Sequence, residues 1–334
     1  MTGVTRSGER DLPSSFFDVI SLGEILVEIM RRERDIMHDV PGVYLGPYPS
    51  GAPAITIDCC ARLGLKSGFI GVVGADDFGS MLINRLKSDG VDTSRIRVDE
   101  GSVTGVAFVA YRSDGSRRFV FNLKQSASAN LSPEDIDPDY VSKTRVLHVS
   151  GSTMYIGEKP RKACLKAIEV VKGNKGLVSL DPNIRLELLS LEGIRKVFNS
   201  VLKDIDLVLV GQDELLMLTG ASEVREAVEK ILGKGPRLVV VKQGKKGSAV
   251  YLENGEVYVA RAFEVEEVDP TGAGDVFNAA FIYGYLKNWD MEKTLLFANA
   301  AGAIKVARQG PMEGPTSLEE VMAFLRSKGV NIKT

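Results

Sequence analysis

Residues 269–275 read Asp-Pro-Thr-Gly-Ala-Gly-Asp, and the continuous, largely apolar segment 276–286 that follows predicts a helix. The three small residues at 272–274 let the backbone approach a ligand closely. A helix that begins at Asp275 would also turn unpaired N–H groups and its positive dipole end toward that ligand. The stretch therefore predicts an anion-binding loop with a carboxylate at its edge. Asp275 would repel an anion, which suggests that it acts on a neutral hydroxyl beside the anion; a plain N-cap after a glycine turn fits the motif alone about as well.

Length, composition and net charge limit the classes of protein to which this chain can belong. The chain has 334 residues, 44% of them apolar, and a net charge of -2 with both signs interspersed, which suits one large soluble α/β domain with an appendage, or two domains. Because there is no basic excess or basic run, nucleic acid and anionic membranes are not expected as partners. Residues 1–15 lack the apolar core of a signal peptide and no later segment resembles a membrane span, so we expect a cytoplasmic location.

Few side chains are available for histidine or thiol chemistry. With only His38 and His148, a histidine triad or a histidine-rich metal site is nearly excluded. The cysteines Cys59, Cys60 and Cys164 are too few and too poorly spaced for a disulfide framework or a metal site. Carboxylates, lysines and backbone groups must carry any chemistry.

Short apolar runs rich in β-branched residues alternate with segments of helical period along most of the chain. Strands are predicted at 18–22, 68–72, 145–149, 177–180, 207–210 and 238–241, and helices at 53–63, 78–89, 160–171, 191–202 and 223–232. Because apolar runs of this kind are buried on both faces, we expect a mostly parallel sheet flanked by helices on both faces. Ligands of such sheets collect at the carboxyl ends of the strands, where residues 269–275 are expected to lie.

Two stretches break this alternation and predict a small β lid. Residues 105–112 and 117–123 alternate around the turn 113–116, and 31–49 is polar with several glycines and prolines. We therefore assign 31–49 and 104–124 to a discontinuous lid that excludes water from the site, and 16–30, 50–103 and 125–330 to the α/β domain. The hairpin could equally be a dimer contact, and we expect a homodimer through the lid. A second hairpin, 248–252 with 256–260, is expected at the sheet margin.

The familiar nucleotide motifs are absent. The segment after the first strand reads Gly23-Glu24-Ile25-Leu26 rather than a dinucleotide-binding glycine fingerprint, and no Walker A motif is present. Residues 242–247, Lys-Gln-Gly-Lys-Lys-Gly, follow a strand directly and could line a nucleotide, although a tight β-turn explains them about as well.

Taken together, the chain resembles the ribokinase-like (PfkB) family of sugar kinases from residue 18 to about residue 325. Residues 269–275 with Phe277 match the family's C-terminal motif. Residues 49–54, Pro-Ser-Gly-Ala-Pro-Ala, followed by 61–64, Ala-Arg-Leu-Gly, match its N-terminal motif, and 71–79 with 89–91 match the segment that usually follows. The resemblance implies a ribokinase-like fold with a β lid.

The resemblance also implies transfer of the γ-phosphoryl group of ATP to a sugar hydroxyl, with Asp275 as the base. A loose phosphoryl-transfer transition state needs mainly positioning and charge stabilisation, which agrees with this assignment. The N–H groups of the anion hole would belong to Gly272, Ala273 and Gly274, and the nucleotide would be lined by Lys242, Gly244, Gly247, Gly272, Gly274 and Asn299.

Two cations are implied by the same resemblance. Glu214 matches the glutamate of an Asn-x-x-Glu motif that helps to hold Mg²⁺ and its waters, whereas Gly211 replaces the asparagine of that motif. Relatives often bind a monovalent cation such as K⁺ through backbone carbonyls beside the anion hole. The matching positions are Asp269, Thr271, Arg308 and Gly310.

The sugar-binding positions depart from the usual family pattern. Glu28 stands where an aspartate is common, Ser50-Gly51 where a Gly-Gly pair is common, and Ile55 where an asparagine is common. Asp58, one helical turn later, could add an acceptor for a sugar hydroxyl or could simply be a solvated helix residue. The substrate pocket is therefore predicted to be rebuilt.

Two subfamilies compete for the substrate. Kinases of 2-keto-3-deoxygluconate resemble residues 137–151 and 181–185, but they usually place an arginine for the substrate carboxylate where this chain has Leu123, with Lys124 the nearest substitute. Bacterial tagatose kinases resemble residues 23–30, 49–58 and 122–124 more closely, so a ketohexose is favoured. Substrate contacts are expected from Glu28, Ser50, Gly51, Asp58, Asn122, Lys124, Arg185 and Asp275. A rival class, a sugar-binding protein that kept the fold and lost catalysis, is suggested by Gly211 and Ile55.

Overall fold

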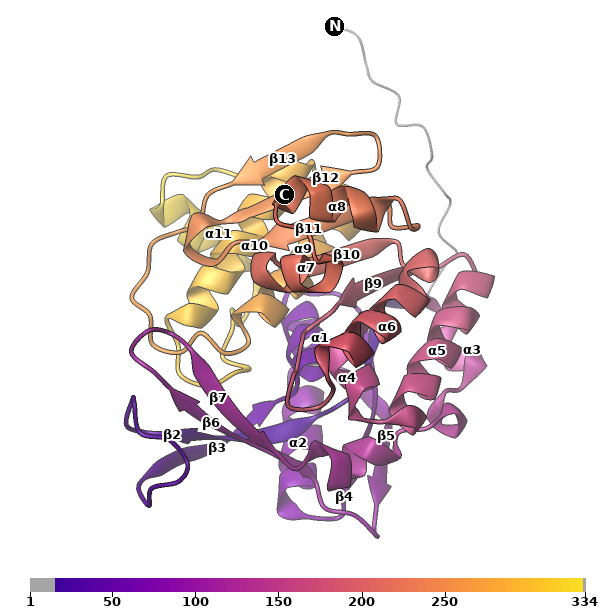
Figure 1. Cartoon of the computed structure of the whole chain (residues 1–334), viewed down its shortest axis with the longest axis vertical. Helices are drawn as coiled ribbons and strands as arrows, with labels where there is room; N and C mark the ends of the chain where they lie inside the picture. The colour runs from indigo at the N-terminus through magenta and orange to yellow at the C-terminus, as the bar shows by residue number, and fades with distance from the viewer. Residues whose placement is uncertain (1–15, 333–334) are drawn as a thin grey trace, which may run out of the picture.

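The computed structural model describes residues 16–332, which form a large central sheet between two helical layers and a smaller sheet at one side (Figure 1). The large sheet has nine strands in the order β13-β12-β11-β10-β9-β8-β1-β4-β5. Their bounds are β1 Phe17–Leu22, β4 Ser67–Gly74, β5 Asp92–Asp99, β8 Thr144–Ser150, β9 Leu177–Asp181, β10 Leu207–Gly211, β11 Leu238–Lys242, β12 Ser248–Leu252 and β13 Val257–Ala260. From β11 to β5 all neighbours are parallel, which confirms the predicted mostly parallel sheet.

The apolar strands bury alternate residues against opposite helical layers. On β10 and β11, Val208 and Val239 belong to one core cluster, whereas Leu209 and Val240 belong to the other. Because both faces are covered, these strands read as continuous apolar runs. One layer contains α3 Pro138–Val141, α4 Gly151–Ile156, α5 Glu158–Gly173, α6 Leu191–Val201, α7 Gln212–Thr219 and α8 Val224–Leu232. The other contains α1 Ala52–Arg62, α2 Asp77–Ser88, α9 Ala273–Leu286, α10 Met291–Val306 and α11 Leu318–Ser327.

The edges of the sheet differ in how well the sequence predicts them. The hairpin β12–β13 lies antiparallel at one margin, as expected for the second hairpin. The opposite margin is β5, which the sequence reading did not include among the strands. Its exposed Arg95 and Arg97 interrupt any apolar run, as is common on an edge strand.

The smaller sheet, called the lid below, has the strand order β3-β2-β6-β7. Its strands are β2 Leu26–Arg31, β3 Tyr44–Ser50, β6 Gly105–Tyr111 and β7 Arg117–Phe121. The predicted hairpin is β6–β7, and β2 pairs in parallel with β6 and antiparallel with β3. The predicted boundary placed residues 26–30 in the α/β domain, whereas the structure makes them a central lid strand. Because almost all of β2 is buried, its sequence looks like that of a core strand.

Within residues 16–332, no helix combines the length and the apolar character needed to cross a membrane.

Candidate active site

A cavity of about 290 Å³ lies between the lid and the carboxyl ends of the parallel strands. Glu24 follows β1, Asp181 ends β9 and Lys242 ends β11, and all three line it. The lid contributes Glu28 from β2 and Phe119 from β7. The site is therefore at the edge of the sheet where open α/β folds bind ligands.

The loop at 269–275 forms one wall of the cavity. Gly272 has a φ of 83° and a Cβ there would lie 2.3 Å from the Pro311 carbonyl oxygen, so both its conformation and its surroundings require glycine. Helix α9 then begins at Ala273, two residues earlier than predicted. The predicted start at Asp275 was wrong because Gly272, in the left-handed region, already acts as the N-cap. Asp275 thus lies within the first helical turn and lines the cavity.

Asp275 is buried and has the pKa of a group that can accept a proton near neutrality. Burial raises its pKa to about 8, and the nearby Asp181 carboxylate adds to the shift, while Lys242 and Arg185 oppose it. A carboxyl group whose pKa lies near the working pH suits general base catalysis better than an ordinary aspartate does. Its place in the cavity and its raised pKa are compatible with the catalytic role expected of Asp275, which stays a prediction.

Lys242 and Asp181 form a buried ion pair beside Asp275. Lys242 Nζ lies 2.7 Å from Asp181 Oδ2 and 3.1 Å from Asn278 Oδ1, and Asn278 Nδ2 donates to the same Asp181 oxygen at 2.6 Å. Burial alone would lower the pKa of Lys242, but Asp181 and Glu214 outweigh it and raise that pKa. A fixed positive charge is thus held next to the anion-binding loop.

Glu214 lies at the same end of the cavity, where Mg²⁺ would bind. Its carboxylate accepts the Ile184 N–H at 2.7 Å and the Gly211 N–H at 3.1 Å, and burial raises its pKa. A Cβ at position 211 would lie 3.1 Å from Glu214 Oε2, so the glycine leaves room for this folded-back carboxylate.

The donor set fits Mg²⁺ bound mainly through nucleotide phosphates. Glu214 and Asp181 both line the cavity and offer carboxylate oxygens, which Mg²⁺ prefers. Among residues 16–332, no group of three or more histidine, cysteine, aspartate or glutamate side chains could hold a metal ion on its own.

The lid side of the cavity is built around Glu28. Ser50 Oγ donates to Glu28 Oε2 at 3.2 Å, and Glu28 Oε1 is buried without a hydrogen-bond partner among the described residues. Burial raises the pKa of Glu28 to about 8, with the Asp269 carboxylate adding to the shift. Gly51 and Ile55 also line this side. An unpaired buried carboxyl oxygen beside a cavity is suited to a ligand hydroxyl.

Several cavity residues were missing from the predicted site, among them Asp181, Arg117, Phe119 and Glu24. Arg117 lies on β7, and its Nη1 is 3.4 Å from Thr271 Oγ1. The ring centroid of Phe119 lies 5.8 Å from the guanidinium carbon of Arg117 and 5.7 Å from that of Arg185. The alternation of Arg117, Phe119 and Phe121 along β7 was the available signal, because alternate residues of a strand share a face. Glu24, which accepts from Ser152 and Thr153, follows β1 without any motif to mark it.

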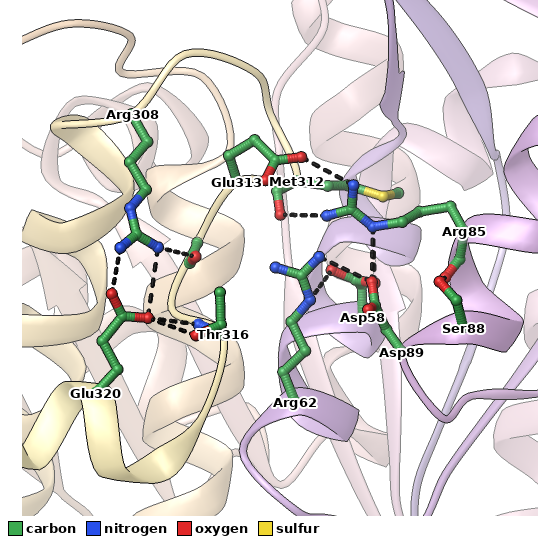
Figure 2. Close-up of polar contacts among 11 residues, drawn as sticks. Asp58, Arg62, Arg85, Ser88, Asp89, Arg308, Met312, Glu313, Thr316 and Glu320 are labelled. Carbon is green, nitrogen blue, oxygen red and sulfur yellow. Dashed lines mark hydrogen bonds and ion pairs between the residues drawn. The ribbon is translucent and has the colours of Figure 1, made fainter.

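Three predicted substrate residues do not line the cavity. Asp58 is neither solvated nor in the site: it is buried, with Arg62 Nε 3.1 Å from its Oδ2 and Arg85 nearby (Figure 2). Burial raises the pKa of Asp58, and Arg62 opposes the shift. Asn122 Oδ1 accepts the Val106 N–H at 2.6 Å and so fixes the lid, whereas Lys124 is exposed. Arg185 does line the cavity, as predicted.

Part of the predicted nucleotide site lies outside this cavity. Gly244 begins a 3₁₀ turn after β11, with open space where its Cβ would be, and Gly247 ends that turn. The Asn299 side chain donates to the carbonyls of Ala260 and Arg261 and accepts from Ser248, so it already holds the β12–β13 hairpin. Nucleotide contacts by these residues stay a prediction.

Two of the four predicted monovalent-cation ligands, the carbonyls of Asp269 and Arg308, accept hydrogen bonds from a lysine. Lys305, on α10, places Nζ 2.8 Å from the Asp269 carbonyl oxygen and 3.0 Å from that of Arg308. The same Nζ lies 3.6 Å from Asp269 Oδ2, whose carboxylate also accepts the Gly310 N–H at 2.9 Å. Carbonyls that were expected to be free for K⁺ therefore already have a cation, and the residues present do not fit a bound K⁺.

Comparisons with known proteins show the family of this chain. The family model described as pfkB family carbohydrate kinase matches residues 18–317. "Probable fructokinase-4" of Arabidopsis thaliana is 34% identical over 96% of this chain and 98% of its own. The 5-dehydro-2-deoxygluconokinase of Clostridium perfringens is 30% identical over 93% of this chain and 94% of its own. A protein of E. coli provisionally assigned as Ribokinase II, solved with ATP and Mg²⁺, is 41% identical, with a TM-score of 0.87 over 93% of this chain and 99% of its own.

Proposed function

Since the chain belongs to the pfkB family of carbohydrate kinases, we propose that the acceptor of this ATP- and Mg²⁺-dependent sugar kinase is a ketohexose such as fructose or tagatose. The observation that carries the proposal is Glu28, whose buried Oε1 lacks a partner beside the cavity. A hydroxyl-rich neutral sugar can donate to that oxygen, whereas an anionic group placed there would lie near the Asp269 carboxylate.

In the proposed reaction, the chain's own residues position the two substrates and stabilise the charge that develops on the transferred phosphoryl group. Asp275 accepts the proton of the sugar hydroxyl as the new O–P bond forms, and it is poised to do so by its raised pKa. The N–H groups at the start of α9 and the Lys242 ammonium face the oxygens of the transferred phosphoryl group. Mg²⁺, held near Asp181 and Glu214, would neutralise the nucleotide phosphates. The lid excludes water from this step.

A sugar acid is the second candidate acceptor, and Arg117 favours it. The expected carboxylate-binding arginine is absent at Leu123, but Arg117 and Arg185 both border the cavity. A guanidinium fork suits a carboxylate, so these two side chains could hold one end of a 2-keto-3-deoxy sugar acid.

A substrate panel distinguishes the two. Initial rates of ADP formation with Mg-ATP would be measured for fructose, tagatose, 2-keto-3-deoxygluconate and 5-dehydro-2-deoxygluconate at matched concentrations. We expect kcat/KM for a ketohexose to exceed that for either acid by at least about tenfold. A preference of that size for an acid would overturn the proposal in favour of the second candidate.

We also propose a homodimer formed through the outer face of the lid. Phe108 and Val120 are 37% and 48% exposed on this sheet, and Phe108 packs edge-on against Tyr44. Exposed apolar side chains on an otherwise formed sheet favour a protein contact. Light scattering after size exclusion would test it: the wild type is expected at twice the mass of a Phe108→Asp variant, and a monomeric wild type contradicts the proposal. The cytoplasmic location stays a prediction.

A further inference from the structure

Lys305 is a fully buried ammonium in a helix segment that is otherwise apolar. Its side chain has no exposed surface, and its neighbours in α10 include Ala300, Ala301 and Ala303. Burying a charge is unfavourable unless it is paired and hydrogen-bonded. The two carbonyl bonds and the Asp269 carboxylate meet that requirement, since a lysine ammonium has three donors and no acceptor.

The ammonium joins the two segments that shape the anion-binding loop. Asp269 opens residues 269–275, and its carboxylate also accepts the Thr271 N–H at 2.9 Å and the Tyr111 hydroxyl at 2.7 Å. The second carbonyl, from Arg308, belongs to the chain after α10, which also supplies Pro311 against Gly272. The position of Lys305 Nζ therefore bears directly on the backbone that forms the loop.

The segment after α10 is held from outside the site as well. Figure 2 shows the Arg308 side chain paired with Glu320, and Arg85 bound to Glu313 and to the Met312 carbonyl. Because these contacts fix the segment at both ends, the Arg308 carbonyl is directed at the ammonium by the fold itself. The carbonyls and the lysine form one preorganised unit.

We propose that the Lys305 ammonium serves as a built-in monovalent cation that holds the anion-binding loop, so that this kinase works without K⁺. An ammonium carries the same single positive charge as K⁺ and is held by the same kind of carbonyl oxygens. Lys305 is a positioning residue, since it acts on the loop through Asp269 and not on the reacting atoms. The inference rests on the sugar kinase activity but not on which sugar is used.

The first test is the cation response of the unmodified enzyme. Activity and Tm are measured in K⁺, Na⁺ and choline chloride at the same ionic strength, about 0.1 M, so that screening is constant. We expect kcat and kcat/KM to agree within about twofold across the three salts, with no K⁺-specific rise in Tm. Activation by K⁺ of about fivefold or more over choline would overturn the proposal. The comparison of Tm values needs no sugar, so it tests for K⁺ binding whichever sugar is the substrate.

Two variants separate a cation role from helix stabilisation, because a lysine near a helix C-terminus is also favourable by itself. Lys305→Met keeps much of the volume and removes the charge, and we expect kcat to fall at least about tenfold in every salt. Lys305→Ala leaves space beside the carbonyls, and we expect K⁺ or NH₄⁺, but not choline, to restore activity severalfold and to raise Tm.

Lys172 provides the matched control. Its Nζ lies 2.8 Å from an Asp206 carboxylate oxygen, and neither residue lines the cavity. Lys172→Met therefore also removes a partly buried ion pair. This variant should lower Tm without changing kcat or the response to cations. Wild-type kcat in a folded Lys305→Met enzyme would overturn the proposal. If both Lys305 variants fail to fold, the cation response of the wild type still decides.

Discussion

The two ends of the cavity differ in how the chain builds them. The end proposed to bind phosphate, called the phosphate end below, comes from residues 269–275, placed at the start of one helix, and from side chains at the ends of neighbouring strands. The lid end takes Glu28 from β2, Ser50 from β3 and Arg117 from β7, which come together only in the folded lid. The residues proposed for the reaction chemistry therefore lie mainly in one short stretch of sequence. The residues proposed for substrate choice are distant in the sequence and meet only in the folded lid.

Each end holds a buried carboxyl group whose pKa is raised to about 8, and the neighbours separate their roles. Asp275 lies near the cations Lys242 and Arg185, beside the anion-binding loop. Glu28 accepts one hydroxyl and keeps one oxygen unpaired. The comparison predicts that changes at the phosphate end alter kcat, while changes at the lid end alter KM and substrate choice.

The largest effect is expected from Asp275→Asn. The amide keeps the shape of the side chain but cannot accept the hydroxyl proton, so kcat should fall by about 10³-fold or more. Calorimetric titration with an ATP analogue should show nucleotide affinity within about threefold of the wild type. An Asp275→Asn enzyme with near-normal turnover would show that Asp275 is not the base, and the proposed difference between the two ends of the cavity would no longer hold.

The pH dependence is the next largest effect. With a pKa of about 8, Asp275 is mostly protonated at pH 6, so kcat/KM should rise about tenfold per pH unit up to pH 8 and then level off. Because bound phosphates would add charges near Asp275, its pKa in the substrate complex can differ from that in the free enzyme. The pH profile of kcat, which reports the complex, is therefore measured separately from that of kcat/KM, which reports the free enzyme. A flat profile of kcat/KM between pH 6 and pH 8 would contradict the raised pKa.

Glu28→Gln should act mainly on sugar binding. The amide retains size but loses the second acceptor, and we expect the KM for the sugar to rise about tenfold with kcat changed less than about threefold.

Stability gives this variant a second readout. Because the folded-state pKa of Glu28 is raised above its unfolded value of about 4.5, its contribution is present below pH 4.5 and is lost as the pH rises through 8. Urea unfolding should therefore show Glu28→Gln gaining stability relative to the wild type between pH 5 and pH 8, by on the order of 3 kcal/mol. An unchanged difference across that range would show that the pKa of Glu28 is ordinary.

The smallest effect is expected from Arg117→Ala. Arg117 is exposed at the mouth of the cavity, so KM for a ketohexose should rise only about two- to threefold, whereas KM for a sugar acid should rise more. Arg118→Ala is the comparison variant, because Arg118 neighbours Arg117 on β7 but points to the other face. Since that is the face proposed for the dimer, the mass of this variant in solution is measured alongside its kinetics. Equal effects of the two substitutions would show that Arg117 does not contact the substrate.

Local patterns predicted the fold, and they failed where distant contacts decide. The role of residues 269–275 in binding phosphate stays a prediction. The β-branched runs gave the parallel sheet because such strands are buried on both faces, but β2 has the same appearance and belongs to the lid. Asp58 has the spacing of a site residue, and only the folded structure brings Arg85 beside it. Lys305 did leave a signal, since a lysine inside an otherwise apolar helical run needs a buried partner.

The placement of Glu28 in the lid sheet and of Asp275 on helix α9 of the α/β domain has a bearing on the fate of ATP when no sugar is present. Asp275 is anchored to the large α/β body, whereas Glu28 belongs to the lid sheet through its strand β2. An acceptor that contacts both carboxyl groups must span the cavity between the two sheets, as a sugar does. Water is always abundant, yet it is too small to reach both, so the architecture discriminates against wasteful hydrolysis by the size of the acceptor.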